Sequence, residues 1–215
     1  SAGTITPTTM RTNNTQILSE TFEVTATSDI VAAYGRAKES AYQLARTLKS
    51  IKKDLEHAYV GVDNAAVTGN SSTAREMASA TQQITTSVDA GTNATDPMTE
   101  AKLLELHEDC YDNGSDPNVL MIKPADATIV SGFAASSGRT RDFDTGTALV
   151  NVIDLYVSSF GELRVTLNRN QLTTHAFLID PAMWRSVVLR PFTRELLAKT
   201  SDSSVHAVVG EYSLK

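Results

Sequence analysis

The sequence predicts an α+β fold from three observations, which are its helical patterns, its strand patterns and their order along the chain. Apolar residues recur at spacings of three and four in residues 30–59, which indicates one long amphipathic helix. Apolar and polar residues alternate in residues 16–27 and 205–214, which is typical of half-buried strands. Helices come mostly first and strands mostly later, without repeating strand–helix–strand units, and this order favours an α+β architecture.

Composition excludes several classes of protein. The chain has 215 residues, enough to bury a core without disulfides or a structural metal. The single cysteine, Cys110, excludes an intramolecular disulfide and a cysteine-rich zinc site. No apolar run approaches the roughly 20 residues that a membrane span requires. A net charge of −6 argues against a protein whose main task is to grip nucleic acid.

The N-terminal third centres on the predicted helix of residues 30–59. Residues 1–14 are polar and are expected to form an arm or loop, and residues 16–27 a strand. Ser28 and Asp29 then offer an N-cap and a first-turn acid. At 1.5 Å per residue the helix would be roughly 45 Å long. A coiled coil is the alternative, but the small residues Ala37 and Ala41 favour close packing on a sheet.

The middle of the chain is predicted to alternate loops with shorter elements. Residues 61–97 read as a long loop with a possible helix at 73–88. A second helix is expected from Thr99, its N-cap, to residue 111. A short buried strand at 119–122 and a helix near 125–133 follow. The inward face of the second helix would carry Leu103, Leu104, His107 and Cys110.

The last third is mostly strand. Residues 149–157 and 162–167 are predicted to form a hairpin, and further strands are expected at 175–179, 187–189 and 205–214. The loop of residues 136–146 carries Arg139 and Arg141. In Arg190-Pro191-Phe192, a proline within a strand-like stretch marks an edge or a bend. We expect Arg190 to pair with an acid on a neighbouring segment.

The sequence contains no set of residues typical of a catalytic or cofactor-binding site. The G-x-S-x-G nucleophile turn and the glycine-rich phosphate loops are absent from the sequence. His107 and Cys110 share a helix face, but zinc needs three or four ligands and the other histidines are scattered. We therefore interpret both as packed side chains and expect no catalytic, cofactor or metal site. Such a composition suits assembly better than turnover.

Several segments resemble the major capsid (major head) proteins of tailed bacteriophages. Their order and spacing cover nearly the whole chain. They are TQILSET (15–21), GRAKESAYQLA (35–45), IKKDLE (51–56), FGEL (160–163), NR (168–169), LRPF (189–192), LAKTSDS (197–203) and EYSL (211–214).

This resemblance implies the Hong Kong 97 type of capsid fold. Residues 1–29 would be an N-terminal remnant with the return strand of the E-loop. Residues 30–98 and 190–215 would form the peripheral (P) domain, with residues 30–59 as its spine helix. Residues 99–189 would mostly form the axial (A) domain. The family carries a longer N-terminal arm and a further C-terminal strand, so the chain is expected to be a truncated or proteolytically matured form.

The function that the resemblance implies is a structural one. Copies of the chain would form hexamers and pentamers that close into an icosahedral shell around phage double-stranded DNA. The protein would be part of the virion, assembled in the host cytoplasm, with no cofactor and no membrane partner. Scaffold, portal or decoration proteins are further expected partners, and DNA would be contacted only weakly. Arg190, Arg139 and Arg141 are the candidates for contacts between subunits. The alternative is an encapsulin-like or prophage-derived shell that packages protein cargo.

Overall fold

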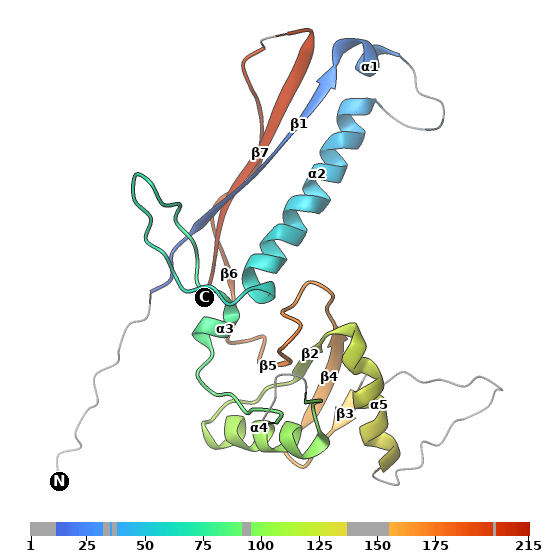
Figure 1. Ribbon diagram of the computed structural model, residues 1–215, viewed down its shortest axis with the longest axis vertical. Coiled ribbons are helices and arrows are strands. Elements are labelled where there is room, and N and C mark those ends of the chain that lie inside the picture. The colour runs from blue at the N-terminus through green and yellow to red at the C-terminus, as the bar shows by residue number, and fades with distance from the viewer. Residues whose placement is uncertain (1–11, 32–34, 36–37, 92–95, 137–154, 200) are drawn as a thin grey trace.

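The computed structural model describes residues 12–31, 35, 38–91, 96–136, 155–199 and 201–215. Figure 1 shows an elongated region and a compact region arranged along the long axis of the molecule. In the elongated region a long helix runs beside a three-stranded sheet. In the compact region a pair of helices flanks a four-stranded sheet. Among the described residues, no helix combines the length and apolar character needed to cross a lipid bilayer.

The elongated region is built on the antiparallel sheet β1-β7-β6. Its strands are β1 (Gln16–Thr25), β6 (Ser186–Leu196) and β7 (Ser203–Leu214). The first and last strands of the chain therefore lie side by side, with Gln16 opposite Tyr212 and Thr25 opposite Ser203. Burial alternates along β1, as the sequence pattern predicts, whereas the central strand β7 is buried along most of its length.

The predicted helix of residues 30–59 is wrong in its first third. A short helix, α1 (Ala26–Ile30), ends before it, and the long helix α2 begins only at Glu39 (Glu39–Glu56). Gly35 has a φ of +82°, a left-handed backbone that a continuous helix cannot contain. At its far end α2 runs into a π-helical turn, η1 (His57–Gly61).

The caps at this corner also differ from those predicted. Thr25, and not Ser28, caps α1, because the Thr25 hydroxyl accepts a hydrogen bond from the Ser28 amide. The side chain of Asp29 caps α2 from a distance, since its Oδ1 accepts a 3.0 Å hydrogen bond from the Ser40 amide. Helix α1 and the start of α2 lie together at the tip of the elongated region (Figure 1), and each is capped there by a side chain.

The inward face of α2 packs on the sheet, which confirms the interpretation of an amphipathic core helix. Ile51, 1% exposed, is the centre of this contact. The cluster comprises Phe22, Val24, Ile51 and Val208, with Leu18, Leu44, Leu48 and Phe192 packed around it. Ala41 is exposed, so the close approach expected of it does not occur.

The segment after η1 is mainly loop. Of the helix predicted at residues 73–88 only α3 (Ala80–Gln83) forms. The loop before α3 is held by a bridge between Val67 and Glu76. The small polar residues of this segment supply too few apolar contacts for a longer helix, and their backbone groups pair locally instead.

The compact region contains the mixed sheet β3-β4-β2-β5, in which only β2 and β4 are parallel. Leu103, Leu120 and Leu163 form the centre of its core. Its elements are α4 (Glu100–Asp112), β2 (Val119–Ile122), the 3-10 turn η2 (Pro124–Asp126), α5 (Ala127–Ser136), β3 (Leu155–Val157), β4 (Glu162–Leu167) and β5 (Phe177–Ile179).

Several local predictions for this region are confirmed. The Thr99 hydroxyl accepts a hydrogen bond from the Lys102 amide and so caps α4. Leu103 and His107 on α4 face inward, whereas Leu104 and Cys110 are only half-buried. The hairpin of β3 and β4 forms as predicted, although its expected first half, residues 149–154, lies outside the described residues.

Candidate assembly surface

The exposed strand β6 is the most unusual surface of the elongated region. It pairs with β7 on one side only and is therefore an edge of the sheet. Nearly every residue of the strand is exposed. Its large apolar side chains are 40–68% exposed and are Val187, Val188, Leu189 and Leu196. We call strand β6 with these four side chains the β6 edge. Exposed apolar side chains on a sheet edge mark a docking surface or an aggregation risk.

The middle of the β6 edge is irregular. The pairing register of β6 with β7 shifts twice, between Val188 and Arg190 and again between Arg190 and Thr193. Pro191 lies within this stretch and has no backbone N–H to offer to the ladder. Such irregularities prevent a second strand from extending the sheet along the whole edge. A partner on this edge would therefore be recognised mainly through side chains.

Phe192 closes the bulge on the inner side. Its ring packs 4.7 Å, centroid to centroid, from that of Tyr212, and its amide donates to the Tyr212 hydroxyl at 3.3 Å. A Cβ atom on Gly210 would come within 2.5 Å of the Phe192 ring. Glycine at 210 is therefore what allows the ring to lie flat on β7. The packing of Phe192 on β7 therefore holds the bulge and its proline in place.

The buried carboxylate of Glu211 on β7 binds side chains from three other segments of the chain. Its carboxylate accepts from Arg190 Nε at 3.0 Å and from the Thr15 hydroxyl at 2.6 Å, and it also binds the guanidinium of Arg75. The side chain of Glu211 is only 5% exposed. We call these four residues the Glu211 cluster. It joins the N-terminal segment, the loop before α3, β6 and β7.

The charge of Glu211 is stabilised by these partners. The hydrogen bond from Thr15, followed by Arg190 and Arg75, holds the pKa of Glu211 below its usual value, although burial acts in the opposite direction. Glu211 is therefore ionised at neutral pH. A buried carboxylate with three donors holds its neighbours in place more firmly than an exposed ion pair does.

Asn13 forms further hydrogen bonds to the loop before α3 and to β7. Its side-chain amide donates to the carbonyl oxygens of Ala78 and Leu214, at 3.2 and 2.7 Å, and its Oδ1 accepts from the Ala78 amide at 2.8 Å. The segment from Asn13 to Thr15 therefore holds the loop before α3 against the end of β7. The sequence predicts an arm or loop for residues 1–14, and Asn13 and Asn14 lie in a loop that these hydrogen bonds hold in place.

The predicted site residues have different outcomes. Arg190 pairs with an acid on a neighbouring strand, as expected from the sequence, and its side chain remains 57% exposed. Arg139 and Arg141 lie outside the described residues. Sequence reasoning did not find the roles of Arg75 and Thr15, and the separation of 136 residues between Arg75 and Glu211 explains why no local pattern marks the pair.

His107 and Cys110 fit the packed role that the sequence suggests. His107 is 1% exposed, its Nδ1 lies 2.9 Å from the Ser158 hydroxyl, and burial lowers its pKa. Burial, with the nearby Asp109, raises the pKa of Cys110, so its thiol is protonated at neutral pH. Among the described residues, no three His, Cys, Asp or Glu side chains are grouped so that they could hold a metal ion.

Two comparisons match the chain to phage major capsid proteins, and a third finds a similar fold in an encapsulin. A family model described as SU10 major capsid protein matches residues 1–215. The major capsid protein of Escherichia phage Phieco32 is 26% identical over 262 aligned residues, which cover 99% of this chain and 74% of the relative. The holo-SrpI encapsulin complex of Synechococcus elongatus PCC 7942 contains a similar fold, with a TM-score of 0.55 at 11% identity, covering 94% of this chain and 69% of the other.

Proposed function

The chain belongs to the SU10 major capsid protein family, and we propose that it builds its shell from hexamers and pentamers that close into an icosahedron around phage double-stranded DNA. The protein is a capsid protein of the virion that assembles with copies of itself. Its family is a structural family and not a family of enzymes. Many modest contacts, repeated by symmetry, hold such a shell together.

The division into Hong Kong 97 type domains belongs to this proposal. The elongated region, with α2 beside β6 and β7, corresponds to the P domain, and α2 corresponds to its spine helix. The compact region corresponds to the A domain, and β1 to the return strand of the E-loop. The likeness to an encapsulin supports this general architecture. Because β6 begins at Ser186, the boundary proposed at residue 190 would move to the start of this strand.

The β6 edge is the observation that carries the proposed assembly. Its four apolar side chains are exposed, although the sheet behind them is well packed. Because these side chains are already 32–60% covered, burying what remains against a second copy would favour association by roughly 1–2 kcal/mol for each one. Arg190, exposed at the centre of this edge, would lie at the boundary between subunits. Arg139 and Arg141 are proposed for the same role in the A domain.

The test compares two substitutions on the β6 edge with one elsewhere. Leu189→Asp and Leu196→Asp place a charge on side chains that are 61% and 68% exposed, so each should change the free energy of unfolding by at most about 0.5 kcal/mol. Electron microscopy and sedimentation should show that these variants no longer form shells. Ile30→Asp, at a position 82% exposed on α1, is the matched control and should assemble. Normal shells from both edge variants would contradict the proposal.

A compartment that packages protein cargo is the second candidate, and the likeness to the SrpI encapsulin is the observation that favours it. The contents of purified particles separate the two functions. Double-stranded DNA inside the shell would support the phage capsid, and a cargo enzyme without DNA would support the compartment. Scaffold, portal or decoration proteins would appear in the same preparations as additional bands of fixed stoichiometry.

A further inference from the structure

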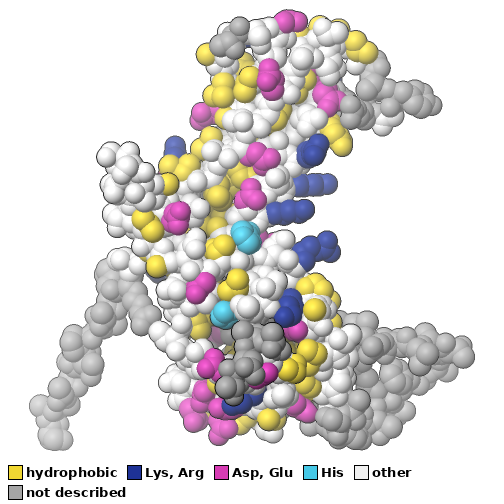
Figure 2. Space-filling model, in the orientation of Figure 1, with side chains coloured by type: hydrophobic (Ala, Val, Ile, Leu, Met, Phe, Trp, Pro, Cys, Tyr) yellow, Lys and Arg dark blue, Asp and Glu magenta, His cyan; other side chains and the backbone are white. Residues whose placement is uncertain are grey.

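One face of α2 carries a row of basic side chains that assembly through the β6 edge does not use. Figure 2 shows dark blue side chains projecting side by side along this helix. Those on its exposed face are Arg46, Lys49 and Lys53, with Lys52 on the flank. Lys53 and Arg169 line one groove where α2 meets the loop after β4. We call Arg46, Lys49, Lys53 and Arg169 the α2 basic stripe.

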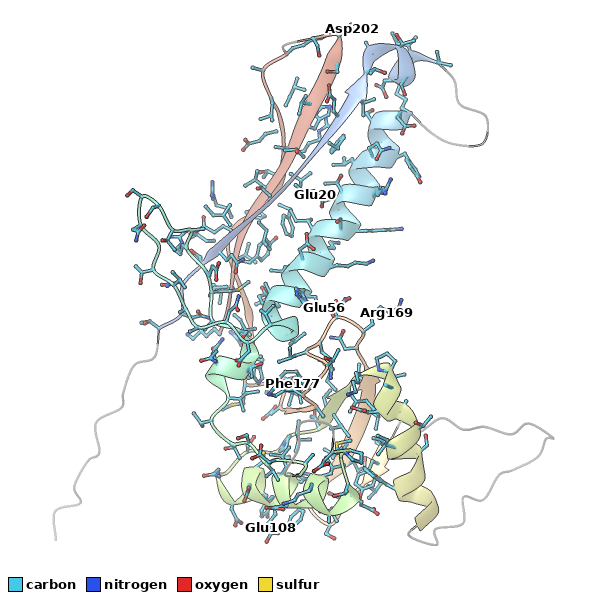
Figure 3. All side chains as sticks on the ribbon, in the orientation of Figure 1. Glu20, Glu56, Glu108, Arg169, Phe177 and Asp202 are labelled. Atoms are coloured by element: carbon cyan, nitrogen blue, oxygen red, sulfur yellow. The ribbon has the colours of Figure 1, made fainter. Side chains whose placement is uncertain are left out.

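The position of the stripe follows from helix geometry. Residues 46, 49 and 53 are three and four positions apart, so they share one face of α2. Thr47 and Ile51, which are buried against the sheet, lie on the opposite face. Arg169, labelled in Figure 3 beside the end of α2, continues the row onto the compact region. The stripe is thus a continuous line of cations across both regions of the molecule.

No residue of the stripe forms an ion pair within the described residues of the chain, although the Glu56 carboxylate lines the same groove as Lys53 and Arg169. The ion pairs found there involve Arg75, Lys102, Lys123, Arg190 and Lys199, and none of them involves a residue of the stripe. Glu56, the carboxylate in the groove, is held by the side chains of Asn168 and Asn170 at 2.7 Å. Asp54 is exposed on a neighbouring face of α2.

Building on the function proposed above, we infer that the α2 basic stripe faces the inside of the shell and binds the phosphate backbone of the packaged DNA. Seven residues separate Arg46 from Lys53, a rise of about 10 Å, over which one DNA strand presents about three phosphates. Long flexible cations in a line suit a uniform row of phosphates, which they contact without reading the base sequence. Because the whole chain carries a charge of −6, the contact would be local and weak.

A second copy of the chain is the competing occupant, and the described surfaces favour DNA over it. Strand β6 carries four exposed large apolar side chains, whereas the stripe has Tyr42, one turn before Arg46, and Leu167, in its groove, beside its basic side chains. A row of cations with few apolar neighbours gains little from a protein interface, where charged residues are depleted from the core. Against a polyanion the same row releases counterions, which is favourable at ordinary salt.

The first test examines assembled, DNA-filled particles. Formaldehyde, which links lysine amines to bases, is added to intact particles, and the DNA-bound peptides are identified by mass spectrometry. We expect these peptides to contain Lys49, Lys52 or Lys53, and not Lys102 or Lys199. DNA-bound peptides that come only from other segments would overturn the inference.

The second test measures the salt dependence of binding by the unassembled chain to a 20-base-pair duplex. The variant Lys49→Gln/Lys53→Gln should reduce the slope of log K against log salt by about 2, because two phosphate contacts are lost. The control Lys102→Gln/Lys199→Gln removes the same charge from exposed positions that pair with Glu105 and Asp202, and its slope should equal that of the wild type. Equal slopes for the wild type and both variants would overturn the inference.

Shell formation separates this inference from the function on which it depends. The Lys49→Gln/Lys53→Gln variant should still form shells, since the β6 edge is intact. Loss of shells with unchanged DNA binding would assign the stripe to a contact between copies and overturn the inference. Failure of the wild-type chain to form shells would instead count against the proposed capsid assembly.

Discussion

Glu56 Oε1 accepts a 2.7 Å hydrogen bond from the side-chain amide of Asn168, which lies 112 residues later in the chain. Its second oxygen, Oε2, accepts from Asn170 at the same distance. Glu56 is the last residue of α2, and both asparagines follow β4, so one carboxylate joins the elongated and compact regions (Figure 3). An apolar cluster of Val60, Ala80, Phe177 and Leu214 lies at the same junction.

We predict that Glu56→Gln weakens this junction. The glutamine amide keeps one acceptor but turns a donor toward a neighbouring asparagine amide, so one of the two bonds is lost. The free energy of unfolding should fall by about 1–3 kcal/mol in urea denaturation. Asp54→Asn, which removes the same charge from an exposed position two residues earlier, is the control and should stay close to the wild type. Equal stabilities for both variants would show that the junction depends on the apolar cluster alone.

We predict that Glu211→Gln loosens the loop that Arg75 anchors. The neutral amide retains fewer acceptors for Thr15, Arg75 and Arg190, so the loop before α3 should open more often. Trypsin should then cleave after Arg75 several-fold faster than in the wild type. Glu162→Gln, an exposed position on β4, is the matched control.

The same variant gives a prediction about pH. The pKa of Glu211 is lowered in the folded state, so its charge contributes stability above the unfolded value of about 4.5. That contribution is lost as the pH falls through the folded pKa. The stability difference between wild type and Glu211→Gln, from urea denaturation, should therefore shrink on acidification below about pH 4.5. A difference that stays constant down to pH 3 would show that the carboxylate is not the group responsible.

Elements with a local signal could be predicted from the sequence. The alternation in residues 16–25, the cap at Thr99 and the proline in β6 each depend on neighbouring residues, and each was found near its expected place. The acid partner of Arg190 could be anticipated because a charged residue beside a strand bend tends to pair across the strand. Its identity as Glu211 depends on the register of β6 and β7, which the sequence does not specify.

The features that could not be predicted from the sequence concern backbone conformation and long-range contacts. The apolar spacing continues through Ile30 and Tyr34, so it predicts a helix where the left-handed Gly35 interrupts the chain. Side-chain periodicity carries no information about that dihedral angle. The Glu211 cluster draws on four segments that are adjacent only after the sheet has formed. The basic residues of α2 already lay together in the predicted helix of residues 30–59, and only the place of Arg169 beside the end of α2 required the structure.

We predict that Asp29, and not Ser28, determines how firmly the first turn of α2 is held. The backbone amide of Ser40, which donates to Asp29, is the main cause that lowers the pKa of Asp29. In Asp29→Ala this amide loses its acceptor, so hydrogen exchange at Ser40 should be several-fold faster. Ser28→Ala should leave this exchange rate unchanged. If Ser28→Ala had the larger effect, the cap predicted from the sequence would be the correct one.

Because the His107 side chain is buried, we predict that the folded protein loses stability on mild acidification. Burial lowers the pKa of His107 in the folded protein, with the charge of Asp116 acting in the opposite direction. In the unfolded chain the imidazole takes up a proton near its ordinary pKa of about 6.5, and in the folded chain it does so only at lower pH. The neutral form therefore stabilises the folded state above about pH 6.5. This stabilisation is lost as the pH falls toward the folded pKa, with a slope of at most about 1.4 kcal/mol per pH unit.

The measurement is urea denaturation between pH 8 and pH 5. The wild type should lose stability below about pH 6.5, and His107→Gln, which cannot be protonated in this range, should show a smaller slope. His107→Gln should already be less stable at pH 8, because the contact of 2.9 Å with Ser158 is disturbed. Identical slopes for wild type and His107→Gln would show that another group governs the acid sensitivity, because the buried imidazole is the only group removed in that comparison.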